Sequence, residues 1–238
     1  VKMDSKEIKN QDDLIERLVT DGKDIVEDLV KNEMSREKSW QHCYKIFKNF
    51  KNKTMDEREE DLLALNLGFY LASFGMYRGS SFLINYDYKI HKNVIKKFNE
   101  EKDKIICGDF INYDTYNELK EGISNSYKLY AEQSKNFVTE TLVTKILLGV
   151  FSCIPAFDRN LRRVLKEAKD KLGEDINQSV NEKTIAFLQE LATKVENKMM
   201  EELNQKQKEY LQNNGYNKVR ILDLCVWAYG AELLKKDK

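Results

Sequence analysis

The chain contains a single proline, Pro155, and only ten glycines among 238 residues. Proline and glycine supply most of the tight turns that join β-strands, so their scarcity argues against a fold rich in strands. Apolar residues instead recur at spacings of three and four, which is the period of amphipathic helices. The sequence therefore predicts an all-α fold.

Histidine and cysteine, two common ligands of transition metals, are also scarce. His42 and His91 are the two histidines, and the four cysteines lie far apart without a C-x-x-C pair. This pattern argues against a zinc site and a disulfide framework, so we expect reduced core thiols, no cofactor and no transition metal. A carboxylate-bound Mg²⁺ stays open. The cysteines are Cys43, Cys107, Cys153 and Cys225.

The chain also lacks an excess of charge and a long apolar run. Basic and acidic residues both number 40, so no global field draws it to DNA or an anionic membrane, and a nucleic-acid surface must be local. The longest apolar stretch, residues 62–84, is too interrupted for a membrane span, and the first residues lack the apolar segment of a signal peptide. We expect a cytoplasmic protein without membrane contact, and its richness in Lys, Asn and Ile is typical of AT-rich bacterial genomes.

The helical pattern predicts one domain over residues 1–238, with about nine helices around a buried central helix at about residues 55–78. Thr54 and Glu57 form a T-x-x-E capping box at the start of that helix, which is expected to run to Tyr77 and to be buried almost all round. A stripe of small residues along it would let another helix pack closely. The stripe consists of Ala64, Gly68, Ala72, Gly75 and Gly79.

The stretch "TKILLGVFSCIPAFDRNLRR", residues 144–163, contains two charged residues that call for an explanation. Lys145 lies in an apolar run, so its ammonium must either reach water along its four-carbon stem or lie in a cavity. A lysine amine kept from water gives up its proton more readily and can act as a nucleophile or form a Schiff base. Asp158 precedes a helix as its natural N-cap, a position that keeps a carboxylate ionised and aimed. The structural and the catalytic interpretations both stay open.

This order of Thr-Lys, apolar helix, proline and an Asp that opens a further helix resembles the end of the helix-hairpin-helix DNA glycosylases of the 8-oxoguanine type. In that family a lysine of the hairpin attacks the sugar carbon, and an Asp at a helix start assists. The resemblance implies that Lys145 is the Schiff-base nucleophile, that Asp158 is the carboxylate and that DNA is the partner. It covers about twenty residues, and "VTETLV", residues 138–143, stands where the family has a glycine-rich hairpin.

Basic residues follow Asp158 along the predicted helix. Such a stripe can neutralise phosphates, although a solvated helix face is the plainer interpretation. The candidate nucleic-acid-binding residues are Arg159, Arg162, Arg163 and Lys166.

A second pattern is "SREKSWQHCY", residues 35–44, in which Arg36 and His42 are six positions apart. This spacing resembles that of the HEPN ribonucleases, in which paired helices bring an Arg and a His together to cleave RNA. The resemblance implies Arg36 and His42 as an alternative catalytic pair, whereas a hydrogen-bonded histidine at the edge of the core is the structural alternative. A third hypothesis is a non-catalytic module that binds a protein partner through a charged helix predicted over residues 181–211.

A candidate pocket is predicted where the central helix ends. Tyr77 and Arg78 lie there, and a buried guanidinium needs a partner, for which Asp158, Asp223 or a ligand phosphate are the candidates. Trp227, four positions after Asp223, is interpreted either as a core residue or as a platform for a flipped base.

Three longer motifs, "SWQHCY", "NLGFYLASFGMYRGSSFL" and "DLCVWAYG", look like those of an uncharacterised family of all-helical bacterial proteins, a likeness that implies no mechanism. The sequence thus favours a nucleic-acid-directed protein, with a glycosylase-like hydrolase for base excision as the working hypothesis. A helical ribonuclease and a protein-interaction module are the alternatives, and a homo-oligomer stays open.

Overall fold

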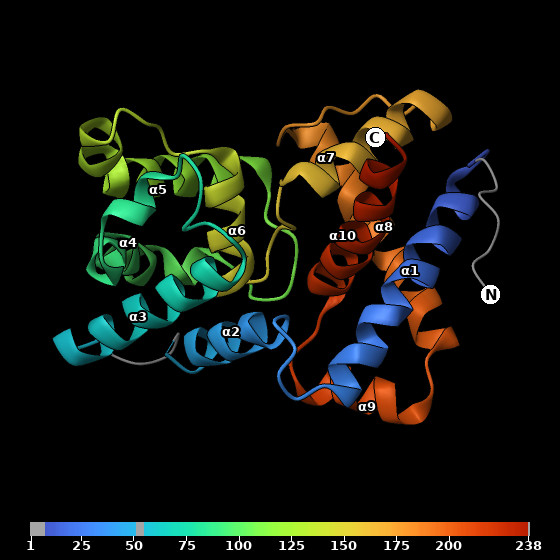
Figure 1. The fold of residues 1–238 in the computed structure, drawn as a ribbon, viewed down its shortest axis with the longest axis horizontal. Coiled ribbons are helices and arrows are strands. Elements are labelled where there is room, and N and C mark those ends of the chain that lie inside the picture. The colour runs from blue at the N-terminus through green and yellow to red at the C-terminus, as the bar shows by residue number, and fades with distance from the viewer. Residues whose placement is uncertain (1–7, 51–54, 238) are drawn as a thin grey trace.

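The computed structural model describes residues 8–50 and 55–237, and this part of the chain contains ten α-helices, three short 3-10 helices and no strand (Figure 1). The all-α prediction is confirmed. The α-helices are α1 (Gln11–Lys31), α2 (Lys38–Phe50), α3 (Glu57–Ser73), α4 (Lys92–Glu101), α5 (Tyr113–Gln133), α6 (Glu140–Val150), α7 (Arg159–Leu172), α8 (Glu182–Glu202), α9 (Gln205–Asn213) and α10 (Lys218–Lys236). The 3-10 helices are η1 (Phe82–Asn85), η2 (Tyr88–His91) and η3 (Lys102–Lys104).

The helices form two groups, which lie side by side (Figure 1). The central lobe comprises α2 to α6, whereas the terminal lobe comprises α1 and α7 to α10, so the first helix packs among the last ones. The chain crosses between the lobes twice, at residues 32–37 (the first crossing) and at residues 151–158 (the second crossing). The sequence did not predict this division. Where the lobes meet, segments that are distant in the sequence become neighbours.

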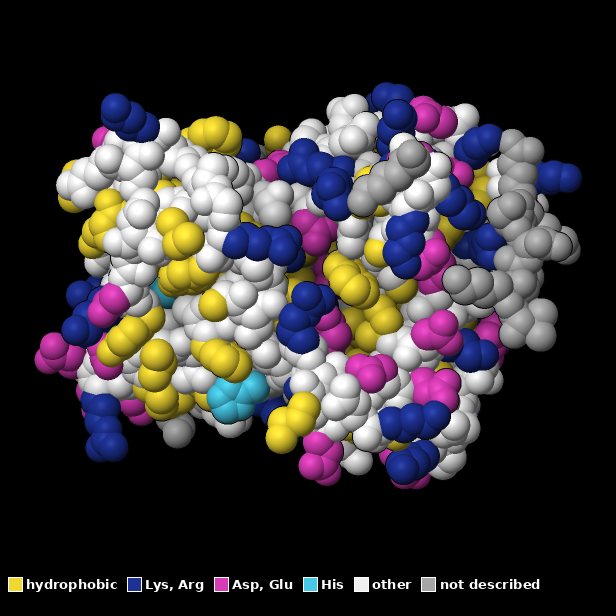
Figure 2. Space-filling model, viewed as in Figure 1, with side chains coloured by type: hydrophobic (Ala, Val, Ile, Leu, Met, Phe, Trp, Pro, Cys, Tyr) yellow, Lys and Arg dark blue, Asp and Glu magenta, His cyan; other side chains and the backbone are white. Residues whose placement is uncertain are grey.

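The most deeply buried helix is α6, in which every residue from Leu142 to Val150 is buried. Its apolar residues cover the whole circumference, and it packs against α2, α3 and α5. The prediction of a central helix over 55–78 is wrong in its extent and burial. α3 ends at Ser73, because the chain turns through Gly75 with φ +76°. It also exposes one apolar face, and Figure 2 shows hydrophobic side chains gathered over this part of the central lobe. The exposed residues are Leu62, Leu65 and Phe69.

The start of α3 also differs from the prediction. Asp56 is the N-cap, and its side chain and that of Glu59 form the capping box. Thr54, expected to form the box, lies outside the described residues. On the predicted small-residue stripe, Gly68 does allow a close approach, but of η2: a Cβ there would lie 3.1 Å from Cβ of Tyr88.

In the terminal lobe, α10 packs against α1, α7 and α8. Gly230 lets α10 approach the start of α7, since a Cβ there would lie 2.5 Å from the backbone oxygen of Asn160. The charged segment 181–211 is two helices instead of the single predicted one. Asn204, between α8 and α9, is the N-cap of α9 and forms a capping box there. None of the described helices combines the length and the apolar character required to cross a lipid bilayer.

Candidate functional site

Lys145 and Asp158 meet where the two lobes join. The Nζ atom of Lys145 lies 3.4 Å from Oδ2 of Asp158, and the side chains are 9% and 22% exposed. Lys145 comes from the middle of α6 in the central lobe, and Asp158 caps α7 in the terminal lobe. The amine therefore reaches a carboxylate between the lobes instead of bulk water.

The second crossing is fixed to α6 by hydrogen bonds, which explains this meeting. The backbone N–H of Phe157 donates to Oγ1 of Thr144 at 2.9 Å, and Oγ1 of Thr141 donates to the carbonyl oxygen of Phe157 at 2.8 Å. The next residue is Asp158, whose Oδ1 accepts from the N–H groups of Asn160 and Leu161 as expected of an N-cap. Thr144 thus holds the crossing beside Lys145, and the cap aims the carboxylate.

The pair lines a small enclosed pocket between the lobes. Its cavity is about 10 Å³, which is room for about one water molecule. Phe74, from the end of α3, and Trp227, from α10, supply aromatic side chains to its lining. Figure 2 shows basic and acidic side chains close together where the lobes meet. The other charged residues of the lining are Glu37, Arg220 and Asp223.

Arg220 is the most deeply buried of these charged residues, at 1% exposure. Its Nη2 donates to Oε2 of Glu37 at 2.6 Å, and its Nη1 contacts Oδ2 of Asp223. Burial raises the pKa of Asp223, against the effect of Arg220. Asp223 in turn accepts from the backbone N–H of Ala156 in the second crossing at 2.9 Å. The Nε atom of Arg220 is buried and has no hydrogen-bond partner among the described residues, so one donor of this lining residue is unused.

Phe74 lies among three cations. The Lys145 Nζ atom is 5.5 Å from the centre of its ring, and the Cζ atoms of Arg36 and Arg220 are 5.6 and 5.7 Å from it. Such distances permit cation–π attraction. Arg36 also lies 5.5 Å from the Trp227 ring, so its half-exposed side chain connects an aromatic group of the central lobe with one of the terminal lobe.

The predicted pocket of Tyr77, Arg78 and Trp227 is not a single pocket. Trp227 lines the cavity beside Lys145, whereas Arg78 is exposed and lines a separate groove. Tyr77 instead contacts Nε2 of His91 through its hydroxyl group at 2.7 Å. The early end of α3 separates these residues, because the chain leaves the helix after Ser73 and turns at Gly75.

His91 is fully buried. Its two ring nitrogens contact the hydroxyl groups of Tyr77 and Tyr127. Burial lowers the pKa of His91 to about 3, so the imidazole is neutral in the folded protein. It serves the central lobe as a hydrogen-bonded core residue.

The four basic residues predicted to bind nucleic acid fall into two pairs. Arg159 and Lys166 are exposed on α7. Arg162 forms an ion pair with Glu140 at 2.9 Å. Arg163 forms ion pairs with residues of α7 and of the chain's C-terminal end, at 2.8 and 2.7 Å. Only the first pair is exposed enough to face a large ligand without breaking an ion pair.

The alternative catalytic pair does not line one site. Arg36 lies in the first crossing, over the rings of Phe74 and Trp227 and beside Glu37. His42 is exposed on α2 and does not line the pocket between the lobes.

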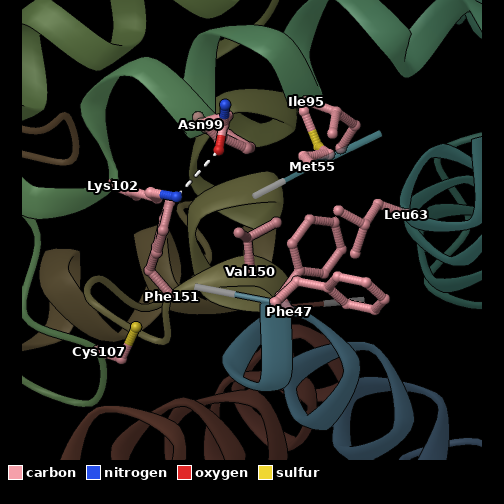
Figure 3. A pocket seen from close by; sticks show the side chains of 11 residues that line it. Phe47, Met55, Leu63, Ile95, Asn99, Lys102, Cys107, Val150 and Phe151 are labelled. Atoms are coloured by element: carbon pink, nitrogen blue, oxygen red, sulfur yellow. Dashed lines mark hydrogen bonds between the residues drawn. The ribbon is translucent and has the colours of Figure 1, made fainter. Parts of the chain in front are cut away.

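A second pocket lies within the central lobe and is apolar (Figure 3). Phe47, Leu63 and Phe151 are among the residues that line it, and at its edge Lys102 donates to Asn99 at 3.1 Å. Its cavity of about 40 Å³ is far below the few hundred Å³ of ordinary ligand pockets. We interpret it as a packing gap of the core. Among residues 8–50 and 55–237, no three His, Cys, Asp or Glu side chains form a group that could hold a metal ion.

Comparison of the chain with models of protein families found no match, and neither did comparisons with curated proteins and with solved structures. The likenesses to glycosylases, to HEPN ribonucleases and to an uncharacterised bacterial family therefore gain no support from them. Sequence reasoning missed Glu37, Phe74 and Arg220 as parts of the site. A signal was present for Arg220, because it lies in an apolar run, as Lys145 does.

Proposed function

We propose that the protein is a nucleic-acid-directed enzyme that excises a base, with Lys145 as nucleophile and Asp158 as its proton acceptor. The observation that carries this proposal is the distance of 3.4 Å between the amine and the carboxylate in a pocket between two lobes. A nucleophile and a base within reach of one another, shielded from water, are what covalent catalysis by an amine needs.

The chemistry begins with the transfer of a proton from the Lys145 ammonium to Asp158. The free amine then attacks C1′ of the sugar, and the N-glycosidic bond breaks with its electron pair leaving on the base. Asp158 returns the proton to the departing base, so charge is balanced. The C1′–O4′ bond next opens as a proton moves from nitrogen to O4′, which yields a Schiff base that water hydrolyses.

The other groups of the pocket suit a planar, uncharged base. Phe74 and Trp227 offer aromatic surfaces, and the free Nε–H of Arg220 offers a donor for a carbonyl oxygen. The lining holds two cations, Lys145 and Arg220, and three carboxylates, Glu37, Asp158 and Asp223, while Arg36 pairs with Glu37 from outside the lining. Since the formal charges of the lining do not leave an excess of positive charge, the pocket favours a neutral group over an additional phosphate.

The cavity of about 10 Å³ cannot admit a nucleotide as it stands. Arg36, at 53% side-chain exposure, is the most accessible of the charged groups around it and spans the rings of Phe74 and Trp227. Substrate entry therefore requires the Arg36 side chain to move away from the two rings.

Borohydride trapping tests the proposed function. The wild-type protein is incubated with a panel of duplex and single-stranded oligonucleotides that carry damaged bases, and sodium borohydride reduces any Schiff base to a stable adduct. We expect an adduct on Lys145 that Lys145→Ala and Asp158→Asn abolish. Lys218→Ala, which removes a partly exposed lysine paired with Asp109, is the matched control and should leave trapping unchanged. No adduct across the panel, or an adduct that survives Lys145→Ala, would overturn the proposal.

A further inference from the structure

The groove lined by Arg78 lies outside the machinery of the proposed function. It has a volume of about 400 Å³ and runs between the segment after α3 and the segment before α6. This size is within the range of ligand sites, unlike the cavities of the two pockets described above. The residues that matter for its chemistry are Arg78, Ser80, Ser81, Asn136, Phe137 and Thr139.

Arg78 is the one charged side chain among the residues that line this groove, and it is exposed. Its guanidinium makes no hydrogen bond or ion pair with any residue that the structure describes, in contrast to those of Arg162, Arg163 and Arg220. Gly75 provides the space for it, since a Cβ there would lie 2.8 Å from Nε of Arg78. The groove thus holds an unpaired guanidinium against its backbone.

Phe137 adds an exposed aromatic ring to the same groove, with 72% of the residue accessible to water. The position of this segment is fixed, because the side-chain amide of Asn136 donates to the carbonyl oxygen of Ser80 on the opposite wall, and its Oδ1 accepts from the N–H of Phe137 at 2.9 Å. A large aromatic group held open to solvent is a platform on which a planar ligand can stack.

Hydroxyl groups complete the lining. The oxygen of Thr139 accepts from the N–H of Leu142 as the N-cap of α6, which leaves its own hydrogen free to point elsewhere. Ser80 and Ser81 lie on the other wall. Hydroxyl donors beside a guanidinium and the positive end of a helix are suited to phosphate oxygens.

We infer that this groove binds an unpaired stretch of nucleic acid, with a phosphate on Arg78 and a base stacked on Phe137. Arg78 gives the lining a positive charge, which complements the negative charge of a phosphodiester. A base can stack on a side chain only when it is not paired within a duplex, which favours a single strand. An apolar peptide would use the ring but would leave the guanidinium without a partner.

The groove adjoins the pocket of Lys145. Phe74 lines the pocket and Gly75, the next residue, lines the groove. Thr139 lies six residues before Lys145, which is about 9 Å along the axis of α6. A strand seated in the groove is therefore within a short distance of the proposed nucleophile. The inference deepens the proposed function and rests on it for the class of ligand.

Binding of a fluorescein-labelled oligothymidylate, measured by anisotropy at several salt concentrations, tests the inference. We expect Arg78→Ala to weaken binding about tenfold. It should also reduce the slope of the logarithm of the binding constant against the logarithm of the salt concentration by about the amount that one phosphate contact contributes. Phe137→Ala should weaken binding about tenfold with little change in salt dependence. A duplex of the same length should bind more weakly than the single strand.

Matched controls come from α3. Arg58→Ala removes an exposed arginine at the far end of that helix, and Phe69→Ala removes an exposed aromatic ring; both should bind as the wild type does. Lys145→Ala should also bind normally, so a failure of excision is distinguishable from a failure of the groove. No binding by the wild type, equal binding by the groove variants, or loss with Arg78→Ala but not Phe137→Ala would each overturn the assignment to a single strand.

Discussion

Replacing Lys145 by Met and Asp158 by Asn, singly and together, measures how strongly the two groups interact in the folded protein. Asn is as good an N-cap as Asp, so Asp158→Asn keeps the hydrogen bonds to the first turn of α7 and removes the charge. Met keeps most of the length and apolar volume of Lys145. The double-mutant cycle therefore isolates the ion pair from capping and packing.

The magnitude follows from distance and burial. Two unit charges at 3.4 Å attract by about 5 kcal/mol at the effective dielectric constant of about 20 that suits sites near a protein surface. Removal of the charges from water opposes this attraction. Asp223, in the same pocket, also attracts Lys145 and reduces what Asp158 alone contributes. We expect a coupling free energy of about 2 kcal/mol, with the larger single loss for Asp158→Asn because it leaves a buried ammonium without its partner.

Urea unfolding followed by far-ultraviolet circular dichroism supplies the four free energies of unfolding. All four proteins should unfold with the same dependence on urea, since the exposed surface is unchanged. A coupling free energy within about 0.5 kcal/mol of zero would refute the reasoning, because distant and independent sites add to within that range. The amine and carboxylate would then not form the pair on which the proposed function rests.

Three further predictions concern His91, Gly230 and Arg36. Burial lowers the pKa of His91 to about 3, so below about pH 6.5 the unfolded chain binds a proton that the folded protein does not. The free energy of unfolding therefore decreases as the pH is lowered, by up to about 1.4 kcal/mol per pH unit. In His91→Gln the loss between pH 7 and pH 5, measured by urea unfolding, should be smaller by about 2 kcal/mol. Gly230→Ala should cost about 1–3 kcal/mol in thermal or urea unfolding, because the added Cβ would lie 2.5 Å from the backbone oxygen of Asn160. Arg36→Ala should speed reductive methylation of Lys145, followed by mass spectrometry, since it removes the side chain that spans the two rings at the pocket.

Each of these predictions has an outcome that contradicts it. An equal pH dependence in wild type and His91→Gln would mean that the imidazole is not kept neutral by burial. Unchanged stability in Gly230→Ala would mean that α10 and α7 are not as close as described. For Arg36→Ala, the control is Arg159→Ala on the exposed start of α7, and equal labelling in both variants would show that Arg36 does not limit access.

Several features of the site were predictable because they depend on local sequence. Asp158 has the position of an N-cap before an amphipathic run, and the structure has it as the cap of α7. Lys145 is conspicuous because charge is rare in apolar runs, and it is buried. The 3.6-residue period and the scarcity of proline and glycine likewise predicted the helices, but not where α3 ends.

The partners of these residues were not predictable, because they come from distant parts of the chain. Arg220 and Glu37 are 183 positions apart and meet only because the first helix packs among the last ones. Arg78 was expected to be buried and Trp227 to share its pocket, yet the turn after Phe74 takes Arg78 to an exposed groove.

The sequence by itself determined that this protein is all-helical and that Lys145 and Asp158 call for an explanation. These properties follow from the helical period, from capping and from the cost of burying charge, all of which act within a few turns of chain. Only the tertiary structure decided that the amine meets the carboxylate. That meeting depends on hydrogen bonds that backbone N–H groups of the second crossing donate to Thr144 and Asp223, and thus on packing between lobes that a one-dimensional pattern does not contain.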